Sequence, residues 1–213
     1  RKVIVDKDDN VWMGTRKGIY KYDQKKDEVV SFNAKIRDLS KGVIADFIVF
    51  ALYEDSNKNI WVGTDGYGLF SYSAVQDSFT WHGKNSEIRN MSINSITQTY
   101  DGYYWLGTDN GLIRYDQGSD DFRIFESADG LLSKKINRSA FYTERNTLYL
   151  GTSEGINFFD FNNIPLNNSI PKIIFQDLKI GNEKIAVAKD GPLKKSIQHL
   201  SLIHISEPTR RKR

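Results

Sequence analysis

Hydrophobic and polar positions alternate along much of this chain with the two-residue period of β-strands. Phe122 and Ile124, for example, point to one face of an extended segment, while Arg123 and Phe125 point to the other. The apolar segments are short, rich in β-branched and aromatic residues, and separated by turns that contain Asp, Asn and Gly. We find no stretch with the 3.6-residue spacing of a helical repeat. The pattern therefore predicts an all-β fold.

The same group of strands recurs four times. Each unit contains an aromatic residue followed by x-Gly-Thr, and then a second Gly that starts another apolar strand. The aromatic residues are Trp12, Trp61, Trp105 and Tyr149, which lie 49, 44 and 44 residues apart. This interval holds four short strands with their turns, the content of one β-propeller blade. We therefore predict a partial β-propeller of about four blades that forms an unclosed arc.

The third unit illustrates the expected strands. They are residues 93–100, the Trp-x-Gly-Thr strand around Trp105, residues 112–115 and an outer strand at 122–125. We expect the tryptophans to form the core between adjacent blades. The motif glycine, which has no Cβ, is expected to make room for a bulky aromatic side chain of the neighbouring blade.

The repeats define the expected domain organisation. Residues 1–161 are predicted to be the C-terminal blades of a propeller, and residues 162–171 a linker rich in turn residues. The last blade has no fourth strand in sequence, and we expect the other end of the propeller to supply it. Residues 172–199 are predicted to begin a β-sandwich domain. Residues 200–210 resemble a translated sequencing adapter, so we expect residues 200–213 to be non-native.

Composition and charge exclude several classes of function. The net charge of +3 comes from the final residues, because without residues 200–213 lysine plus arginine equals aspartate plus glutamate. The rest of the chain therefore lacks the basic character of a nucleic-acid-binding protein, and we expect no nucleic acid to bind it. Cysteine is absent, which excludes disulfides and thiol catalysis. No apolar run approaches the roughly 20 residues of a membrane-spanning helix.

Motifs for catalysis, metals and cofactors are also missing. There is no nucleophile elbow, phosphate-binding loop or metal-ligand cluster, so we expect no catalytic residue, no metal and no cofactor. Asp6-x-Asp8-x-Asn10 and Asp55-x-Asn57-x-Asn59 match the start of a calcium-binding EF-hand loop. Both segments lack the glycine and the glutamate that complete such a loop. We therefore expect hairpin turns at these positions rather than calcium sites.

Ligand contacts are expected on the face that carries the turns between second and third strands together with the crossovers between blades. Aromatic, arginine, aspartate and asparagine side chains gather there, and such residues suit the stacking and hydrogen bonding of sugars. Tyr67, in a Gly-Tyr-Gly turn, is the first candidate. The other candidates are Arg16, Arg37, Asp65, Arg89, Asn90, Asp109, Asn110 and Arg138, with Lys17, Asp38, Lys135 and Glu154 as further members of the same loops.

The motif Trp-x-Gly-Thr-x-x-Gly-Leu-x-x-Tyr-Asp resembles the repeat of two-component-regulator propellers. The segment from Pro171 to His199, which includes Gly-Pro-Leu-Lys-Lys-Ser-Ile at 191–197, is similar to the start of the immunoglobulin-like domain that follows such propellers. Together they resemble the periplasmic sensor region of hybrid two-component systems from Bacteroidetes. The resemblance implies an oligosaccharide ligand, a homodimer formed through the immunoglobulin-like domain, a membrane anchor downstream, and control of polysaccharide-utilisation genes.

Two other functions stay open. Propellers often serve as protein-interaction scaffolds, and some are lyases or glycoside hydrolases, since the fold alone does not define the function. For this fragment we expect no enzymatic activity. The resemblance places the histidine kinase and response regulator outside it.

Overall fold

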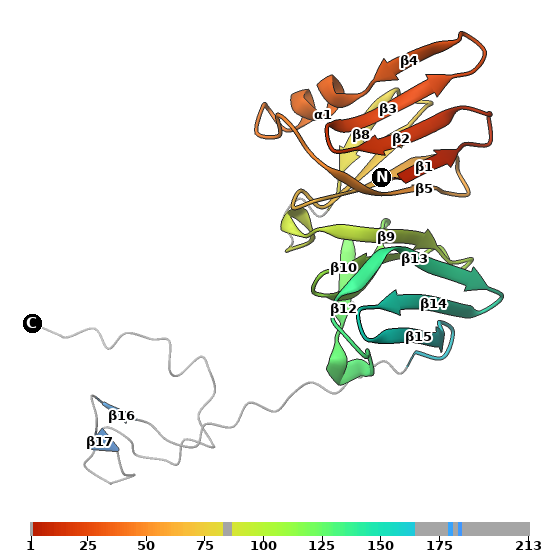
Figure 1. Cartoon of the computed structure of the whole chain (residues 1–213). Coiled ribbons are helices and arrows are strands. Elements are labelled where there is room, and N and C mark those ends of the chain that lie inside the picture. The colour runs from red at the N-terminus through yellow and green to blue at the C-terminus, as the bar shows by residue number, and fades with distance from the viewer. Residues whose placement is uncertain (1, 83–86, 165–178, 181–182, 185–213) are drawn as a thin grey trace, which may run out of the picture. The chain divides into compact units, whose positions relative to one another are not determined.

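The computed structural model describes residues 2–82, 87–164, 179–180 and 183–184. The chain divides into two compact units, residues 1–164 and 165–213. In the first unit, four antiparallel sheets follow one another along the chain, and none of them is closed into a barrel (Figure 1). The all-β prediction and the unclosed arc of propeller blades are confirmed.

Each of the first three blades is a four-stranded meander. Blade 1 contains β1 (Lys2–Val5), β2 (Val11–Thr15), β3 (Gly18–Asp23) and β4 (Glu28–Ser31). Blade 2 contains β5 (Val49–Glu54), β6 (Ile60–Thr64), β7 (Leu69–Ser73) and β8 (Ser78–Trp81). Blade 3 contains β9 (Ile93–Gln98), β10 (Tyr104–Thr108), β11 (Gly111–Asp116) and β12 (Asp121–Phe125). These strands agree with the predicted ones to within one or two residues.

Blade 4 has three strands, β13 (Ile136–Glu144), β14 (Thr147–Thr152) and β15 (Gly155–Asp160). In the second unit, β16 (Lys179–Ile180) pairs antiparallel with β17 (Glu183–Lys184). Most of the predicted segments 162–171 and 172–199, and all of 200–213, lie outside the described residues. The expected β-sandwich domain therefore stays a prediction.

The crossovers between blades explain the uneven spacing of the repeats. The first crossover contains the helix α1 (Asn33–Leu39), which the sequence pattern did not reveal. The later ones contain only the 3-10 turns η1 (Glu87–Asn90) and η2 (Ser127–Asp129). The additional helical residues account for the longer first interval. The side chain of Ile36 anchors α1, because it is fully buried in the core between blades 1 and 2.

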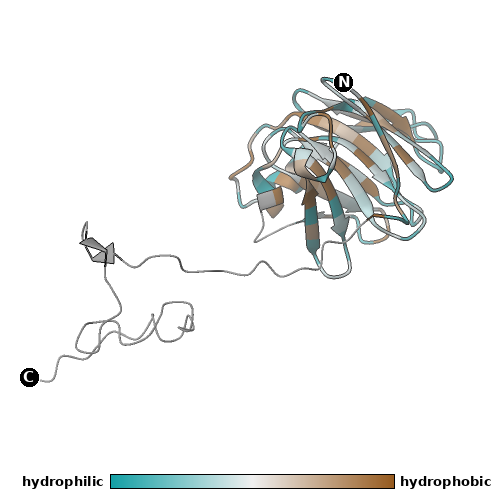
Figure 2. Cartoon of the chain, turned by 90° about the horizontal axis from the view of Figure 1, so that it is seen from below, coloured by the Kyte–Doolittle hydropathy of each residue, from teal (hydrophilic) through white to brown (hydrophobic). Residues whose placement is uncertain are grey.

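The hydrophobic core lies between the blades. Trp12, Trp61 and Trp105 are at most 2% exposed, and each belongs to the cluster shared with the following blade. Hydrophobic residues accordingly gather on the strands, and hydrophilic ones on the turns (Figure 2). β6 and β10 are buried along their whole length, since both faces of a middle blade are covered. The prediction that the tryptophans form the inter-blade core is confirmed.

The motif glycines lie against the first strand of the next blade. A Cβ atom on Gly63 would lie 2.7 Å from the carbonyl oxygen of Ile93, and one on Gly107 would lie 2.5 Å from Cγ2 of Ile136. The nearest side chain in both cases is a β-branched aliphatic one, although Phe141 also comes within 3.0 Å of the Gly107 position. The predicted close approach is correct. The prediction that an aromatic residue makes it is wrong for Gly63 and correct only in part for Gly107, where Phe141 lies behind Ile136. β-Branched residues suit these strands because they pack well on a pleated surface.

A tyrosine–aspartate pair ties the third strand of each complete blade to the turn that follows it. The hydroxyl groups of Tyr22, Tyr72 and Tyr115 donate to carboxylates five residues later, at 2.8, 2.6 and 2.6 Å. The acceptors Asp27, Asp77 and Asp120 all have positive φ angles, of 53°, 49° and 56°. Aspartate tolerates this left-handed conformation better than most residues. This second repeat signature was not recognised from sequence.

Candidate functional site

Two opposite faces of the blades carry the loops. We call the face with the second-to-third-strand turns and the crossovers the crossover face, and the face with the first-to-second-strand turns the hairpin face. The predicted ligand residues belong to the crossover face.

Tyr67 and Arg89 meet around Trp81 on the crossover face. The Arg89 guanidinium lies 3.5 Å from the centre of the Trp81 ring, and the ring stacks on Phe70 at 5.3 Å. The indole nitrogen donates to the carbonyl oxygen of Tyr67 at 3.0 Å. Tyr67 itself is partly buried against the core. The Trp81 ring is therefore already in contact with Arg89 and Phe70.

A second stack lies where the first strands converge. The guanidinium of Arg138, from blade 4, lies 3.5 Å from the ring centre of Phe50, from blade 2. Near it, Asn94 donates to the Asp109 carboxylate and to the carbonyl oxygen of Ile136, each at 3.0 Å. Asn94 is 2% exposed, and its side-chain oxygen lacks a hydrogen-bond partner among the described residues. Asn94 is thus a polar connection between blades 3 and 4 that the sequence did not reveal.

The other predicted residues do not form one cluster. Asp65 accepts a hydrogen bond from Ser92 at 2.8 Å, and Arg37 reaches the carbonyl oxygen of Ala45 at 3.5 Å. Arg16, Asn90 and Asn110 are exposed. Three cavities in the described part of the chain are lined by other residues. The assignment of the crossover-face residues to a ligand stays a prediction.

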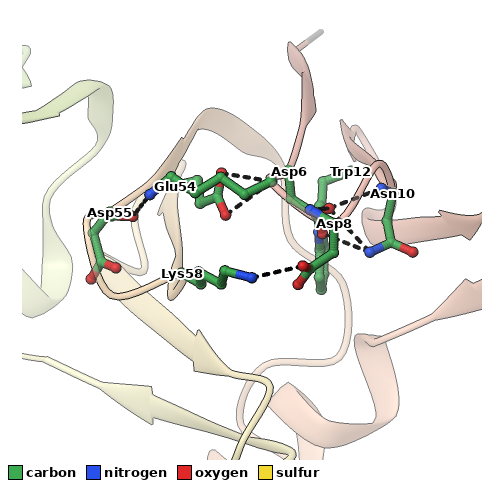
Figure 3. Close-up of polar contacts among 8 residues, drawn as sticks. Asp6, Asp8, Asn10, Trp12, Glu54, Asp55 and Lys58 are labelled. Atoms are coloured by element: carbon green, nitrogen blue, oxygen red, sulfur yellow. Dashed lines mark hydrogen bonds and ion pairs between the residues drawn. The ribbon is translucent and has the colours of Figure 1, made fainter.

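On the hairpin face, an aspartate organises each of the first two turns. In blade 1, Asp6 accepts hydrogen bonds from the Trp12 indole at 2.8 Å and from the side-chain amide of Asn10 at 3.0 Å (Figure 3). In blade 2, Asp55 accepts from the Trp61 indole at 2.8 Å and from Asn59 at 3.0 Å. Both EF-hand-like segments are therefore hairpin turns, as predicted.

Asp55 also receives the hydroxyl of Tyr104 from the next blade, at 2.9 Å. Burial by itself raises the pKa of Asp55, but the hydrogen bonds from Trp61, Asn59 and Tyr104 outweigh it, so the pKa lies below its ordinary value. The carboxylate is 1% exposed and stays ionised with donors on both oxygens.

Direct contacts join the turns of blades 1 and 2. The backbone N–H of Lys7 donates to both carboxylate oxygens of Glu54, at 3.1 and 3.0 Å. Lys58 pairs with Asp8 at 2.7 Å (Figure 3). Gln98 repeats the role of Glu54 one blade later, since its side-chain oxygen accepts from the backbone and hydroxyl of Ser56 at 3.3 Å. The last residue of a first strand thus holds the turn of the preceding blade.

The largest of the three cavities, about 500 Å³, lies among these turns. Its lining comes from three blades: Lys7, then Tyr53 to Ser56, then Gln98, Thr99, Tyr100 and Gly102. A second cavity of about 340 Å³ lies along the converging first strands, and a third of about 260 Å³ at the outer strands of blade 3. Sequence reasoning missed the hairpin-face cavity, because neighbouring blades create it jointly.

A buried histidine joins blades 2 and 3. His82 Nε2 lies 2.7 Å from the Ser71 hydroxyl, and Nδ1 lies 2.9 Å from the Tyr115 hydroxyl. Its ring stacks on Trp61 at 4.6 Å, and burial lowers its pKa to about 4. Ser71 and His82 are only 7% and 6% exposed, so substrate has no access to this serine–histidine pair. The arrangement is that of a structural connection between blades.

The described residues also contain no group of three or more His, Cys, Asp or Glu side chains that could bind a metal ion. None of the helices in that part of the chain has the length and hydrophobicity of a membrane-spanning segment.

Part of the repeat region matches a known family. The profile of the family described as "Two component regulator propeller" matches residues 42–66 and 87–110, which contain the first two strands of blade 2 (β5 and β6) and of blade 3 (β9 and β10). Histidine kinase P4 of Formosa agariphila is 27% identical over 194 residues, which cover 89% of this chain and 14% of that protein.

Solved structures agree with this match. One is the extracellular domain of a protein from B. thetaiotaomicron described as a hybrid two-component system, with 25% identity, a TM-score of 0.61, and coverage of 89% of this chain and 25% of that one. Another extracellular domain from the same organism, described as part of a one-component system, has 24% identity and a TM-score of 0.61, with 74% and 21% covered. The chain thus spans a quarter or less of the length of these relatives.

Proposed function

We propose that the chain is part of the extracytoplasmic, ligand-sensing region of a hybrid two-component sensor kinase, because two of its segments match the two-component regulator propeller family. The observation that carries this proposal is the similarity to the extracellular domain of such a system over 89% of the chain. The similarity to a histidine kinase supports the same reading.

The proposed ligand is an oligosaccharide, and the proposed outcome of binding is a change in transcription of polysaccharide-utilisation genes. In this proposal the region is periplasmic and dimerises through an immunoglobulin-like domain after the propeller. The inter-blade contacts support a sensing role. Tyr104 and Asp55, Lys7 and Glu54, and His82 and Tyr115 connect neighbouring blades, so a ligand that touches several blades acts on one connected network.

Sequencing the source DNA downstream of the codon for His199, with adapter-free long reads, tests the architecture. We expect the reading frame to continue into an immunoglobulin-like domain, one apolar helix and a histidine kinase. A frame that instead encodes residues 200–213 and then stops would contradict the proposal that the chain belongs to a sensor kinase.

A further inference from the structure

We propose that the cavity on the hairpin face is a binding subsite for a neutral saccharide. This inference rests on the proposed function, because it takes the ligand to be an oligosaccharide. It places a contact site on the face opposite to the residues that the sequence suggested. Its volume of about 500 Å³ is within the range of small-molecule sites in proteins.

Three blades build the cavity, and each contributes through the end of its first strand or the turn that follows it. Lys7 comes from blade 1, Glu54 from blade 2, and Gln98 and Tyr100 from blade 3. The turns are already joined by the Lys7–Glu54 and Ser56–Gln98 hydrogen bonds. The walls are therefore held in place before a ligand arrives, which reduces the entropy lost on binding.

Tyr100 supplies an aromatic surface at the rim. Its side chain is 69% exposed, a high value for a tyrosine in a structured turn. The ring contacts Phe161 at 5.3 Å, and its hydroxyl donates to the side chain of Asn162. Tyrosine offers a large amphipathic contact area at a low cost in conformational entropy. An exposed ring held in this way suits stacking against the apolar face of a pyranose.

The polar groups supply both donors and acceptors. The side-chain oxygen of Gln98 is fixed by Ser56, and in residues 2–82 and 87–164 the NH₂ group of Gln98 makes no hydrogen bond. The Lys7 ammonium donates to the carbonyl oxygen of Asp55 at 2.9 Å and has two further N–H groups. Each Glu54 oxygen keeps a lone pair beyond its bond to Lys7. Vicinal hydroxyl groups, which donate and accept at once, match this set.

The charges favour a neutral sugar over an anionic one. The lining contains one ammonium group, of Lys7, and two carboxylates, of Glu54 and Asp55. Asp55 is engaged by protein donors, so its charge is balanced by local dipoles and not by a cation. The other lysine near Glu54, Lys58, is already paired with Asp8. A uronate or sulfate group would therefore meet the negative charge of Glu54, and like charges at short range repel.

The test uses the 213-residue chain and a defined set of oligosaccharides. The neutral members are two to six residues long: gluco-, xylo-, manno- and galacto-oligosaccharides. Oligogalacturonates and sulfated oligosaccharides form the anionic group. Affinity for each is measured by glycan array, and then by titration for the members that bind. The variants are Tyr100→Ala and Gln98→Leu, with Tyr142→Ala as the control, because Tyr142 is a similarly exposed tyrosine (61%) far along the chain in blade 4.

Loss of one hydrogen bond or one aromatic contact at this site should weaken binding of a neutral member about 5- to 10-fold. The control variant should bind as the wild type does. Full retention of binding by Tyr100→Ala and Gln98→Leu, with loss in Tyr67→Ala, would overturn this site and leave the proposed function standing. Binding of anionic members alone would overturn the neutral assignment. If no oligosaccharide binds, both the subsite and the proposed oligosaccharide ligand are refuted.

Discussion

Asp55 is the residue whose removal should most clearly show how the blades are coupled. Its carboxylate accepts the Trp61 indole, the Tyr104 hydroxyl and the Asn59 amide, and Trp61 and Tyr104 are at most 1% exposed. In Asp55→Ala these two buried donors lose their partner. A buried donor left without an acceptor costs about 1–3 kcal/mol. We therefore expect a loss of about 3–5 kcal/mol in the free energy of unfolding.

Asp6→Ala provides the matched comparison. Asp6 holds its own turn and Trp12 in the same way, but no hydroxyl from another blade donates to it in the described structure. Its removal should therefore cost about 1–2 kcal/mol less than removal of Asp55. Of the hydrogen bonds to Asp55, Tyr104→Phe removes only the one from Tyr104, which joins blades 2 and 3. A double-mutant cycle that combines it with Asp55→Ala should give a coupling energy of about 1–2 kcal/mol.

The assay is urea unfolding followed by tryptophan fluorescence, with the midpoint compared at constant slope. Equal losses for Asp55→Ala and Asp6→Ala, or a coupling energy near zero, would refute the reasoning. In that case the Tyr104–Asp55 hydrogen bond would not connect blades 2 and 3 energetically.

Three other substitutions test the packing and the electrostatics. The pKa of His82 is about 4 in the folded chain, below its ordinary value of 6.5. Neutral His82 therefore contributes its whole share of the free energy of unfolding above pH 6.5, and this share is lost by about 1.4 kcal/mol per pH unit as the pH falls toward 4. His82→Gln should remove most of this loss of stability between pH 7 and pH 4.5. If the melting temperature of the variant falls between these two pH values as much as that of the wild type, the prediction is wrong. Gly107→Ala should lower the free energy of unfolding by about 1–3 kcal/mol, because the new Cβ would overlap Ile136. In the same urea assay, Gly118→Ala should lower it by less than about 1 kcal/mol, because the atom nearest to the new Cβ is 3.3 Å away. Phe158, Tyr142 and Ile156 are exposed hydrophobic residues of the blade 4 sheet, and Phe158 is 70% exposed. Phe158→Thr should therefore reduce self-association of the chain in sedimentation velocity, whereas Val75→Thr, in a turn of blade 2, should not. Similar association of both variants would argue against self-association through this sheet.

The strand pattern was predictable because it depends on local chemistry. Alternation of polar and apolar residues, Asp- and Gly-containing turns, and a repeated Trp-x-Gly-Thr motif each restrict the backbone within a few residues. The burial of Trp12, Trp61 and Trp105 followed from the repeat, since a motif that recurs once per blade meets the same neighbour each time.

Contacts between blades were less predictable. Nothing in the sequence pairs Glu54 with the backbone of Lys7, because these residues are 47 positions apart and the contact uses a main-chain group. The helix α1 was missed because it is only 7 residues long, too short to show a helical period. The Tyr–Asp pairs were visible in principle, at a fixed spacing of five residues, but aspartates in turns also have a simpler local explanation.

The residues of the candidate site were also predictable only as far as their local turns, and not in their contacts across blades. Sequence reasoning placed ligand residues in the loops of the crossover face, and the structure gathers only some of them, such as Tyr67 and Arg89 around Trp81. The hairpin-face cavity was not foreseen, because none of its turns forms a concave surface alone. The sequence by itself thus determined the strands, the turns and the repeat, which are set by residues close in the chain. Only the tertiary structure decided which turns meet, since that depends on how one blade packs against the next.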